Sequence, residues 1–291
     1  MRPHQAAFDT VQHYHFESGN AGAHLLILGG IHGNEICGQE ALNTLKTEIE
    51  QGVLKLLKGC LTLVPRANPW ACAADVRYIE KNLNRVIGHP PQPHTYEERI
   101  ASQIATLIDQ CDAMVDLHSV SSGCPEPFVF NDYPNTKNDE LSRVLGGHYI
   151  VGGWAEMFDD PTHDDATTQA YAQSVGKVGV LIECGNHTEP EAVEVAYRAA
   201  TNAMKHLGLI EGAVVTPPLK DDVKITGVHV KGRKGTLADP TFYHMQPITK
   251  GQHIATYDDG EKIYAPADGY LLLPFHAAKI GDEWFCYGIR R

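Results

Sequence analysis

The sequence lacks several features that would assign it to other classes of protein. No apolar run in its 291 residues approaches the roughly 18 residues that a membrane-spanning helix needs. The first residues, Met1-Arg2-Pro3-His4-Gln5, contain no apolar signal-peptide core. Long low-complexity tracts are also missing, although 43% of the residues are hydrophobic. We therefore expect a folded protein without a membrane partner, located by default in the cytoplasm.

Positive charge and paired cysteines are also scarce. Lysine and arginine number 24 against 36 acidic residues, which gives a net charge of −12 and argues against nucleic acid as a partner. The seven cysteines are odd in number and never form Cys-x-x-Cys, so reduced thiols are expected. A Gly-x-Ser-x-Gly elbow is missing too, which disfavours a serine hydrolase.

The most informative motif is Gly-Gly-Ile-His-Gly-Asn-Glu, at residues 29–35. It follows an apolar run, 24–28, that predicts a buried strand, and precedes an amphipathic run, 36–50, that predicts a helix. His32 and Glu35 therefore stand three residues apart on a glycine-rich turn. An imidazole and a carboxylate at that spacing can converge on one zinc ion, and two histidines plus one glutamate form a common catalytic zinc set.

Two later strand ends supply groups that complete this set. His118 follows the predicted strand 112–117, and Glu183 closes the predicted strand 178–183. His118 is the expected third metal ligand. Asp116 lies two residues earlier on the same strand, so its side chain points the same way and could orient a metal ligand by a hydrogen bond. Glu183 is the expected general base, with a structural salt bridge as the alternative interpretation.

Residues 1 to about 210 alternate strand-like and helix-like segments. This alternation predicts an α/β fold, a largely parallel sheet with helices on both faces, and such sheets gather ligands at the carboxyl ends of their strands. The predicted strands are 24–28, 60–64, 112–117, 127–130, 148–151 and 178–183, and the predicted helices are 36–50, 97–110, 138–146, 166–175 and 189–206.

From about residue 214 the pattern changes to short strands separated by turns. The predicted strands are 222–230, 241–244, 253–257, 262–265, 269–274 and 284–289. We therefore predict two domains, residues 1–213 and a smaller β-rich domain of residues 214–291.

A loop rich in polar residues could bind substrate. Residues 77–85 have weak periodicity and contain Arg77, Asn84 and Arg85. Two guanidinium groups and an amide could clamp a carboxylate and a carbonyl oxygen. Alone, the segment would also fit a surface loop.

The ordered set of motifs resembles the succinylglutamate desuccinylase/aspartoacylase family, which belongs to the zinc carboxypeptidase-like hydrolases. The motifs are Gly-Gly-x-His-Gly-Asn-Glu, Arg-Tyr-Ile-x-x-x-Leu-Asn-Arg, Asp-Leu-His and a late strand-end glutamate, and they span residues 29 to 185. The resemblance implies an open mixed sheet flanked by helices, with residues 1–213 as the catalytic domain. The β-rich domain would narrow the channel and exclude long peptides.

The resemblance also implies a role for each matching residue. The activity implied is zinc-dependent hydrolysis of the amide bond of a small N-acyl amino acid, with one Zn²⁺ per chain. His32, Glu35 and His118 match the zinc ligands, and Glu183 matches the base. By the same comparison Arg77 polarises the carbonyl group, while Asn84 and Arg85 hold a substrate carboxylate.

One departure from the family bears on the substrate. Aspartoacylases carry a Thr-Thr-Arg segment before the base strand, whereas this chain has Thr167-Thr168-Gln169. An acidic substrate side chain would lose its counter-charge, at a cost of a few kcal/mol, about 1–3 for an unpaired buried group. We therefore expect a neutral or differently charged acylated amino acid.

The sequence leaves several alternatives open. A metallocarboxypeptidase that acts on short peptides would share the zinc chemistry, and a non-catalytic zinc- or ligand-binding protein would share the pocket. Cys37 and Cys184, beside the proposed site, fit small packing residues better than zinc ligands. The oligomeric state is also open, a homo-oligomer included.

Overall fold

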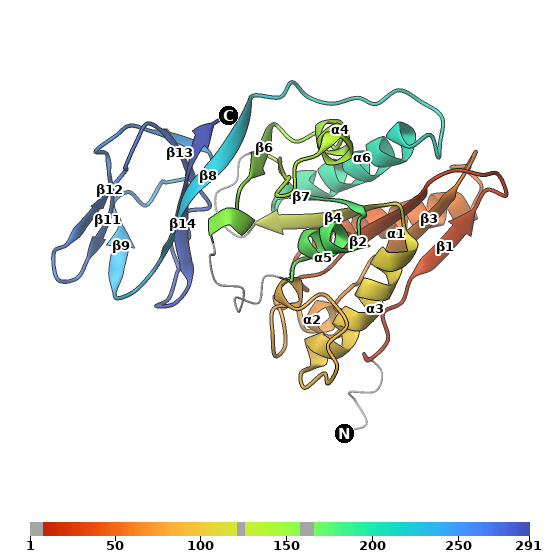
Figure 1. Cartoon of the computed structure of the whole chain (residues 1–291), viewed down its shortest axis with the longest axis horizontal. Coiled ribbons are helices and arrows are strands. Elements are labelled where there is room, and N and C mark those ends of the chain that lie inside the picture. Colours follow the sequence, from red (N-terminus) through yellow and green to blue (C-terminus); the bar gives the residue numbers. More distant parts are fainter. Residues whose placement is uncertain (1–7, 121–125, 158–165) are drawn as a thin grey trace.

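A computed structural model describes residues 8–120, 126–157 and 166–291 of the chain. Its main feature is a mixed sheet of eleven strands, in the order β1-β3-β2-β4-β7-β5-β6-β8-β14-β13-β10 (Figure 1). The strands from the first part of the chain are β1 (Tyr14–Glu17), β2 (His24–Gly29), β3 (Cys60–Val64), β4 (Ala113–Val120), β5 (Phe128–Phe130), β6 (Tyr149–Gly152) and β7 (Val178–Asn186). The predicted α/β fold with an open mixed sheet is confirmed.

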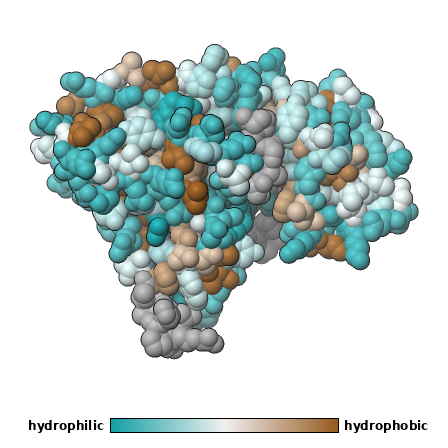
Figure 2. All heavy atoms as spheres, turned by 180° about the vertical axis from the view of Figure 1, so that it is seen from behind, coloured by the Kyte–Doolittle hydropathy of each residue, from teal (hydrophilic) through white to brown (hydrophobic). Residues whose placement is uncertain are grey.

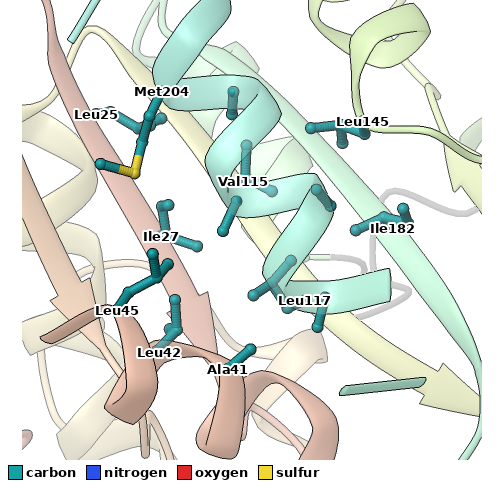
Figure 3. Packing of buried hydrophobic residues seen from close by; sticks show 14 of the residues in the cluster. Leu25, Ile27, Ala41, Leu42, Leu45, Val115, Leu117, Leu145, Ile182 and Met204 are labelled. Atoms are coloured by element: carbon teal, nitrogen blue, oxygen red, sulfur yellow. The ribbon is translucent and has the colours of Figure 1, made fainter. Parts of the chain in front are cut away.

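Helices cover both faces of this part of the sheet. The helices are α1 (Ile36–Glu50), α2 (Pro69–Ala74), α3 (Tyr96–Gln110), α4 (Thr136–Val144), α5 (Thr168–Ser174) and α6 (Glu191–His206), with short 3-10 turns η1 (Leu83–Arg85) and η2 (Ala155–Met157). Side chains alternate between the faces, so Leu25 and Ile27 pack with α1 and α6 while Leu26 and Leu28 pack with α3. Figure 3 shows the first of these two cores, with Leu45 and Met204 over the strands.

The C-terminal region is built from strands, as predicted. Its strands are β8 (Asp221–Val230), β9 (Gly235–Leu237), β10 (Gln246–Ile248), β11 (His253–Tyr257), β12 (Lys262–Tyr264), β13 (Gly269–Leu272) and β14 (Glu283–Arg290). The large sheet continues into this region, because β6 pairs in parallel with β8 from Tyr149↔Asp221 onward. We propose the domain boundary at residues 213/214, in the extended segment between α6 and β8.

Local predictions failed at a few places. The strand predicted at 241–244 is wrong, because Thr241 donates both its backbone N–H and its hydroxyl to Asp239 Oδ1, which closes a turn instead. The sequence reading also missed the edge strand β1 and the short helix α2. Asn68 caps α2 by accepting from the backbone N–H of Ala71, 3.3 Å away, and proline stands at the first helical position.

The surface agrees with the composition. Within the described residues, no helix is long and apolar enough to cross a membrane. Figure 2 shows the molecule from behind, with hydrophilic residues dominating and hydrophobic residues in small separate patches.

Candidate functional site

The His-x-x-Glu motif occupies the tight connection from β2 to α1. Gly33 stands in this turn with its backbone N–H donated to the carbonyl of Arg77, 3.2 Å away. A Cβ atom at Gly33 would come within 2.0 Å of the backbone carbonyl carbon of Ala71, so only glycine fits there. The turn therefore presents His32 before the helix and leaves Glu35 as the residue that precedes its first turn.

The three predicted metal ligands converge in the structure. His32 Nδ1 lies 2.7 Å from Glu35 Oε1, and His118 Nδ1 lies 2.9 Å from Glu35 Oε2. All three side chains are buried, with relative exposures of 3% or less. One ligand atom from each residue lies within 4.8 Å of the others, so the three can share one ion.

The outer nitrogens of both imidazole rings face oxygen atoms. His32 Nε2 lies 3.0 Å from Asn82 Oδ1, and His118 Nε2 lies 2.9 Å from Asp116 Oδ2. The Asn82 oxygen favours a proton on His32 Nε2, which leaves the Nδ1 lone pair of His32 toward the Glu35 carboxylate. The His118 ring lies between Glu35 and Asp116 at ion-pair distance from both, without hydrogen-bond geometry at Nε2. Lone pairs of three acceptors that converge in a buried place need a cation or an added proton between them, so the donor set fits a metal ion.

Burial and neighbouring charges shift the pKa values of these groups in different directions. Burial lowers the pKa of His32 to about 4, helped by the Arg77 guanidinium, so this ring is neutral at pH 7. Burial opposes charge on His118, but Asp116 and Glu35 outweigh it and hold the pKa of His118 well above its usual range. Burial likewise opposes charge on Glu35, yet the two histidines hold its pKa well below its usual range.

Strand register brings Glu183 to the same place. In the parallel pairing of β4 with β7, His118 stands directly beside Glu183, and their side chains share one face of the sheet. The Oε2 atom of Glu183 is buried without a hydrogen-bond partner among the described residues. Burial, followed by the charge of Glu35, raises the pKa of Glu183 to about 8. A carboxyl group of this kind can exchange protons near neutral pH.

The predicted loop residues also reach the site. Arg77 is half-exposed, and its NH1 atom lies 3.1 Å from Glu35 Oε1. Asn84 is buried and accepts from the backbone N–H of Thr168 at 3.0 Å. Arg85 NH2 lies 3.7 Å from Glu283 Oε1, which belongs to β14.

Glu97 on α3 holds this loop in place. It is fully buried, and its carboxylate accepts the backbone N–H groups of Ile79, Glu80 and Lys81 at 2.7, 3.1 and 3.0 Å. The sequence reading missed Glu97, because within a helical pattern it is one more acidic residue of the first turn. The role of Glu97 becomes visible only in the folded structure, because its hydrogen-bond partners precede it by 16 to 18 positions.

The site opens into a cleft of about 630 Å³, a volume that includes its open mouth. The lining joins the sheet, the loop and the β-rich region: His32, Arg77, Asn84, Arg85, His118, Phe130, Asp132, Trp154, Thr167, Gln169, Leu181, Glu183, Leu273 and Glu283. Leu273 and Glu283 come from the β-rich region, so that region forms one wall of the cleft. All seven predicted site residues therefore meet here: six belong to the lining, and Glu35 has a ligand atom within 4.8 Å of those of His32 and His118.

Gln169 lies at the cleft wall. Its amide nitrogen donates to the carbonyl oxygen of Phe130 at 2.7 Å, and the side chain is buried at the cleft wall. Asp132 also lines the cleft, with Oδ1 accepting from the backbone N–H of Trp154 at 2.9 Å. The part of the cleft wall formed by Gln169 and Asp132 thus presents an amide and a carboxylate.

The two neighbouring cysteines are packing residues. Both belong to the buried core, and the Cys37 thiol lies 3.4 Å from the carbonyl oxygen of His118. Burial raises the pKa of Cys184 well above its usual range, which keeps a thiol rather than the thiolate that a metal needs.

Comparison with known proteins points to one family. Residues 21–207 match the model of the succinylglutamate desuccinylase/aspartoacylase catalytic domain. The chain is 26% identical over 257 residues to the N-alpha-acetyl-L-2,4-diaminobutyric acid deacetylase of Halomonas elongata, a match that covers 85% of this chain and 74% of that protein. It is 34% identical over 174 residues to the succinylglutamate desuccinylase of Pseudomonas syringae pv. tomato, covering 54% and 51%.

Solved structures share the fold over nearly the whole chain. A succinylglutamate desuccinylase/aspartoacylase from Rhodobacter sphaeroides gives a TM-score of 0.76 at 19% identity, covering 94% of this chain and 87% of that one. The product-bound ectoine utilization protein EutE from Ruegeria pomeroyi gives 0.74 at 21% identity, covering 96% and 88%. The β-rich region is therefore part of the shared fold.

The three hydrogen bonds that Glu97 accepts should stabilise the loop measurably. Glu97→Ala leaves three backbone N–H groups without their acceptor and should lower the free energy of unfolding by about 2–4 kcal/mol in urea denaturation. Glu97→Gln keeps one acceptor oxygen and should cost less. Glu40→Ala, at an exposed position of α1, should change stability by no more than about 0.5 kcal/mol. Equal stability of all three variants would show that the carboxylate does not hold the loop.

Proposed function

The chain belongs to the succinylglutamate desuccinylase/aspartoacylase family, and from that premise we propose that it is a zinc-dependent hydrolase of N-acyl amino acids. Its named relatives are a deacetylase and desuccinylases, which supports hydrolysis of an N-acyl amino acid. The observation that carries the zinc assignment is the convergence of two imidazole Nδ1 atoms and one carboxylate, with both Nε2 atoms facing oxygens. Nitrogen and oxygen ligands in a hydrolase favour zinc.

The proposed ligands are His32, Glu35 and His118, for one Zn²⁺ per chain at this site. When bound, zinc would supply a Lewis acid that acidifies water and polarises the acyl carbonyl group. Asp116 and Asn82 would orient the imidazole rings through the contacts described above.

Glu183 is proposed to move the proton of the attacking water. A carboxylate oxygen of Glu183 would take that proton and give it to the leaving amine nitrogen as the amide C–N bond breaks. The products are the free acyl carboxylate and the free amino acid. A pKa of about 8 suits a group that first accepts and then donates a proton near neutral pH.

The remaining polar residues are proposed to position the substrate. Arg77, beside Glu35, would donate to the carbonyl oxygen as negative charge develops there. Asn84 and Arg85 would hold the α-carboxylate, with the guanidinium fork as the main contact. Glu283 would limit the freedom of Arg85, since the two lie in ion-pair contact.

The substrate side chain is proposed to be neutral or cationic. Gln169 carries no charge, and Asp132 places a carboxylate on the same wall. The Halomonas elongata relative is named for a substrate with a side-chain amine, diaminobutyric acid. An acidic side chain would meet a carboxylate here instead of an arginine.

A metallocarboxypeptidase is the second candidate, because it would use the same zinc chemistry. The named relatives favour the deacylase, and the wall formed by Leu273 and Glu283 is where the length of a substrate would be limited. The β-rich region would thus act as the selectivity element of the proposed deacylase.

The function is tested by the release of free amine from N-acetyl and N-succinyl amino acids and from short peptides. Zinc-loaded protein should hydrolyse acyl amino acids, and Glu183→Gln should lower kcat/KM by about 10²-fold to 10⁴-fold because the proton carrier is lost. Glu189→Gln, at an exposed position near the start of α6, is the matched control and should keep full activity.

Other outcomes would redirect the assignment. Turnover of peptides alone would favour the carboxypeptidase. Full activity of Glu183→Gln with zinc bound would remove Glu183 from the mechanism. No turnover of any compound with zinc bound would favour a binding protein.

Zinc binding should release protons and weaken in acid. The pKa of His118 lies well above its usual range, so its ring is protonated at pH 7 and must lose that proton to bind metal. Affinity should therefore fall about tenfold for each pH unit of acidification. Calorimetry in buffers of different ionisation enthalpy should find at least one proton released per zinc. Asp116→Asn should release fewer, and binding without proton release would contradict the assignment of His118.

Gln169→Arg should shift the substrate preference. An arginine there would pair with an acidic substrate side chain, so kcat/KM for N-acetylaspartate relative to a neutral N-acetyl amino acid should rise about tenfold or more. Gln173→Arg, at an exposed position of the same helix, is the control and should leave the ratio unchanged. An unchanged ratio in Gln169→Arg would show that residue 169 does not face the substrate side chain.

A further inference from the structure

A second group of possible metal ligands lies at the free edge of the large sheet, away from the cleft. The edge strand β1 carries His15 and Glu17 on one face, and Glu17 pairs directly with Cys60 of β3. An imidazole nitrogen, a carboxylate oxygen and a sulfur from these residues lie within 4.8 Å of one another. Among residues 8–120, 126–157 and 166–291, this strand pairs on one side only, as the sheet order and Figure 1 show.

A chain of hydrogen bonds fixes the orientation of the His15 ring. His24 Nδ1 lies 2.9 Å from the carbonyl oxygen of Gln110, which can only accept, so Nδ1 carries the proton. His24 Nε2 in the neutral ring then accepts from the hydroxyl of Thr62 at 2.8 Å. Thr62 Oγ1 in turn accepts from His15 Nδ1 at 2.8 Å, which leaves His15 Nε2 with its lone pair free.

That lone pair points at another acceptor. His15 Nε2 lies 3.1 Å from Glu17 Oε1, and neither atom carries a proton when both rings are neutral. A proton or a metal cation must lie between them. Two nitrogen or oxygen ligands of tetrahedral zinc at about 2.0–2.1 Å lie about 3.3 Å apart, close to the observed separation.

We propose that His15, Glu17 and Cys60 bind a second metal ion of the zinc type that fastens the edge strand β1 to β3. Imidazole, carboxylate and thiolate together select a borderline transition metal over Mg²⁺ or Ca²⁺. The contact from Thr62 to His15 Nδ1 supplies the outer support that ligating histidines usually have. The three side chains are partly exposed, so the fourth ligand is water and the role is structural.

Cobalt distinguishes this site from the one in the cleft. Of the two candidate groups within the described residues, only this one contains a cysteine, and a Co²⁺–thiolate bond gives a near-ultraviolet charge-transfer band. Chelator-stripped full-length protein titrated with Co²⁺ should bind two equivalents, one of which produces the band. Cys60→Ser should lose the band and bind one equivalent. His15→Ala, at an exposed position, should weaken the band-producing equivalent at least tenfold.

Controls separate this inference from the proposed function. His13→Ala removes an exposed histidine two positions away and should keep both equivalents. Deacylase activity of Cys60→Ser should equal that of the unchanged protein, since Cys60 lies outside the cleft lining. A wild-type titration with no thiolate band, or a band that survives Cys60→Ser, would overturn the second site and show that a protonated His15 simply pairs with Glu17.

Discussion

The buried carboxylate of Glu35 is the constraint on which the rest of the site depends. A charge in this position is costly unless other groups neutralise it, and His32, His118 and Arg77 all direct nitrogen atoms at its two oxygens. The backbone N–H of Ser119 supplies one more donor at 3.1 Å. The same arrangement is one that a divalent cation would complete, so the stability of the buried acid and the proposed chemistry have a common origin.

The register of the parallel strands determines which side chains stand next to one another at the cleft. Parallel pairing places Asp116 of β4 beside Leu28 of β2, and His118 of β4 beside Glu183 of β7. The carboxyl-terminal parts of these three strands therefore lie at the same end of the sheet. Thr168 then links the two halves of the site, because its hydroxyl donates to Asp116 and its backbone N–H donates to Asn84. Thr168 therefore connects Asp116, behind the proposed metal ligand His118, to Asn84, a proposed substrate-binding residue.

The sequence predicted those parts of the site that local patterns determine. His32 follows the apolar strand β2, and hydrophobic periodicity also placed His118 and Glu183 near strand ends. The strands β4 and β7 continue to Val120 and Asn186, so both residues lie within them rather than at the predicted ends. Glu97 and the continuation of the sheet from β6 into β8 could not be predicted, because both depend on partners distant in the chain. Turn chemistry explains the failed strand at 241–244, since no hydrophobic pattern reports the Asp239–Thr241 contact.

The central claim is that His32, Glu35 and His118 hold the metal on which hydrolysis depends. The most direct test is anomalous diffraction at the zinc absorption edge from crystals of active, zinc-loaded protein. If these residues hold zinc, a strong anomalous peak will lie between the two Nδ1 atoms and the Glu35 carboxylate. Active crystals with no peak at that place would contradict this claim.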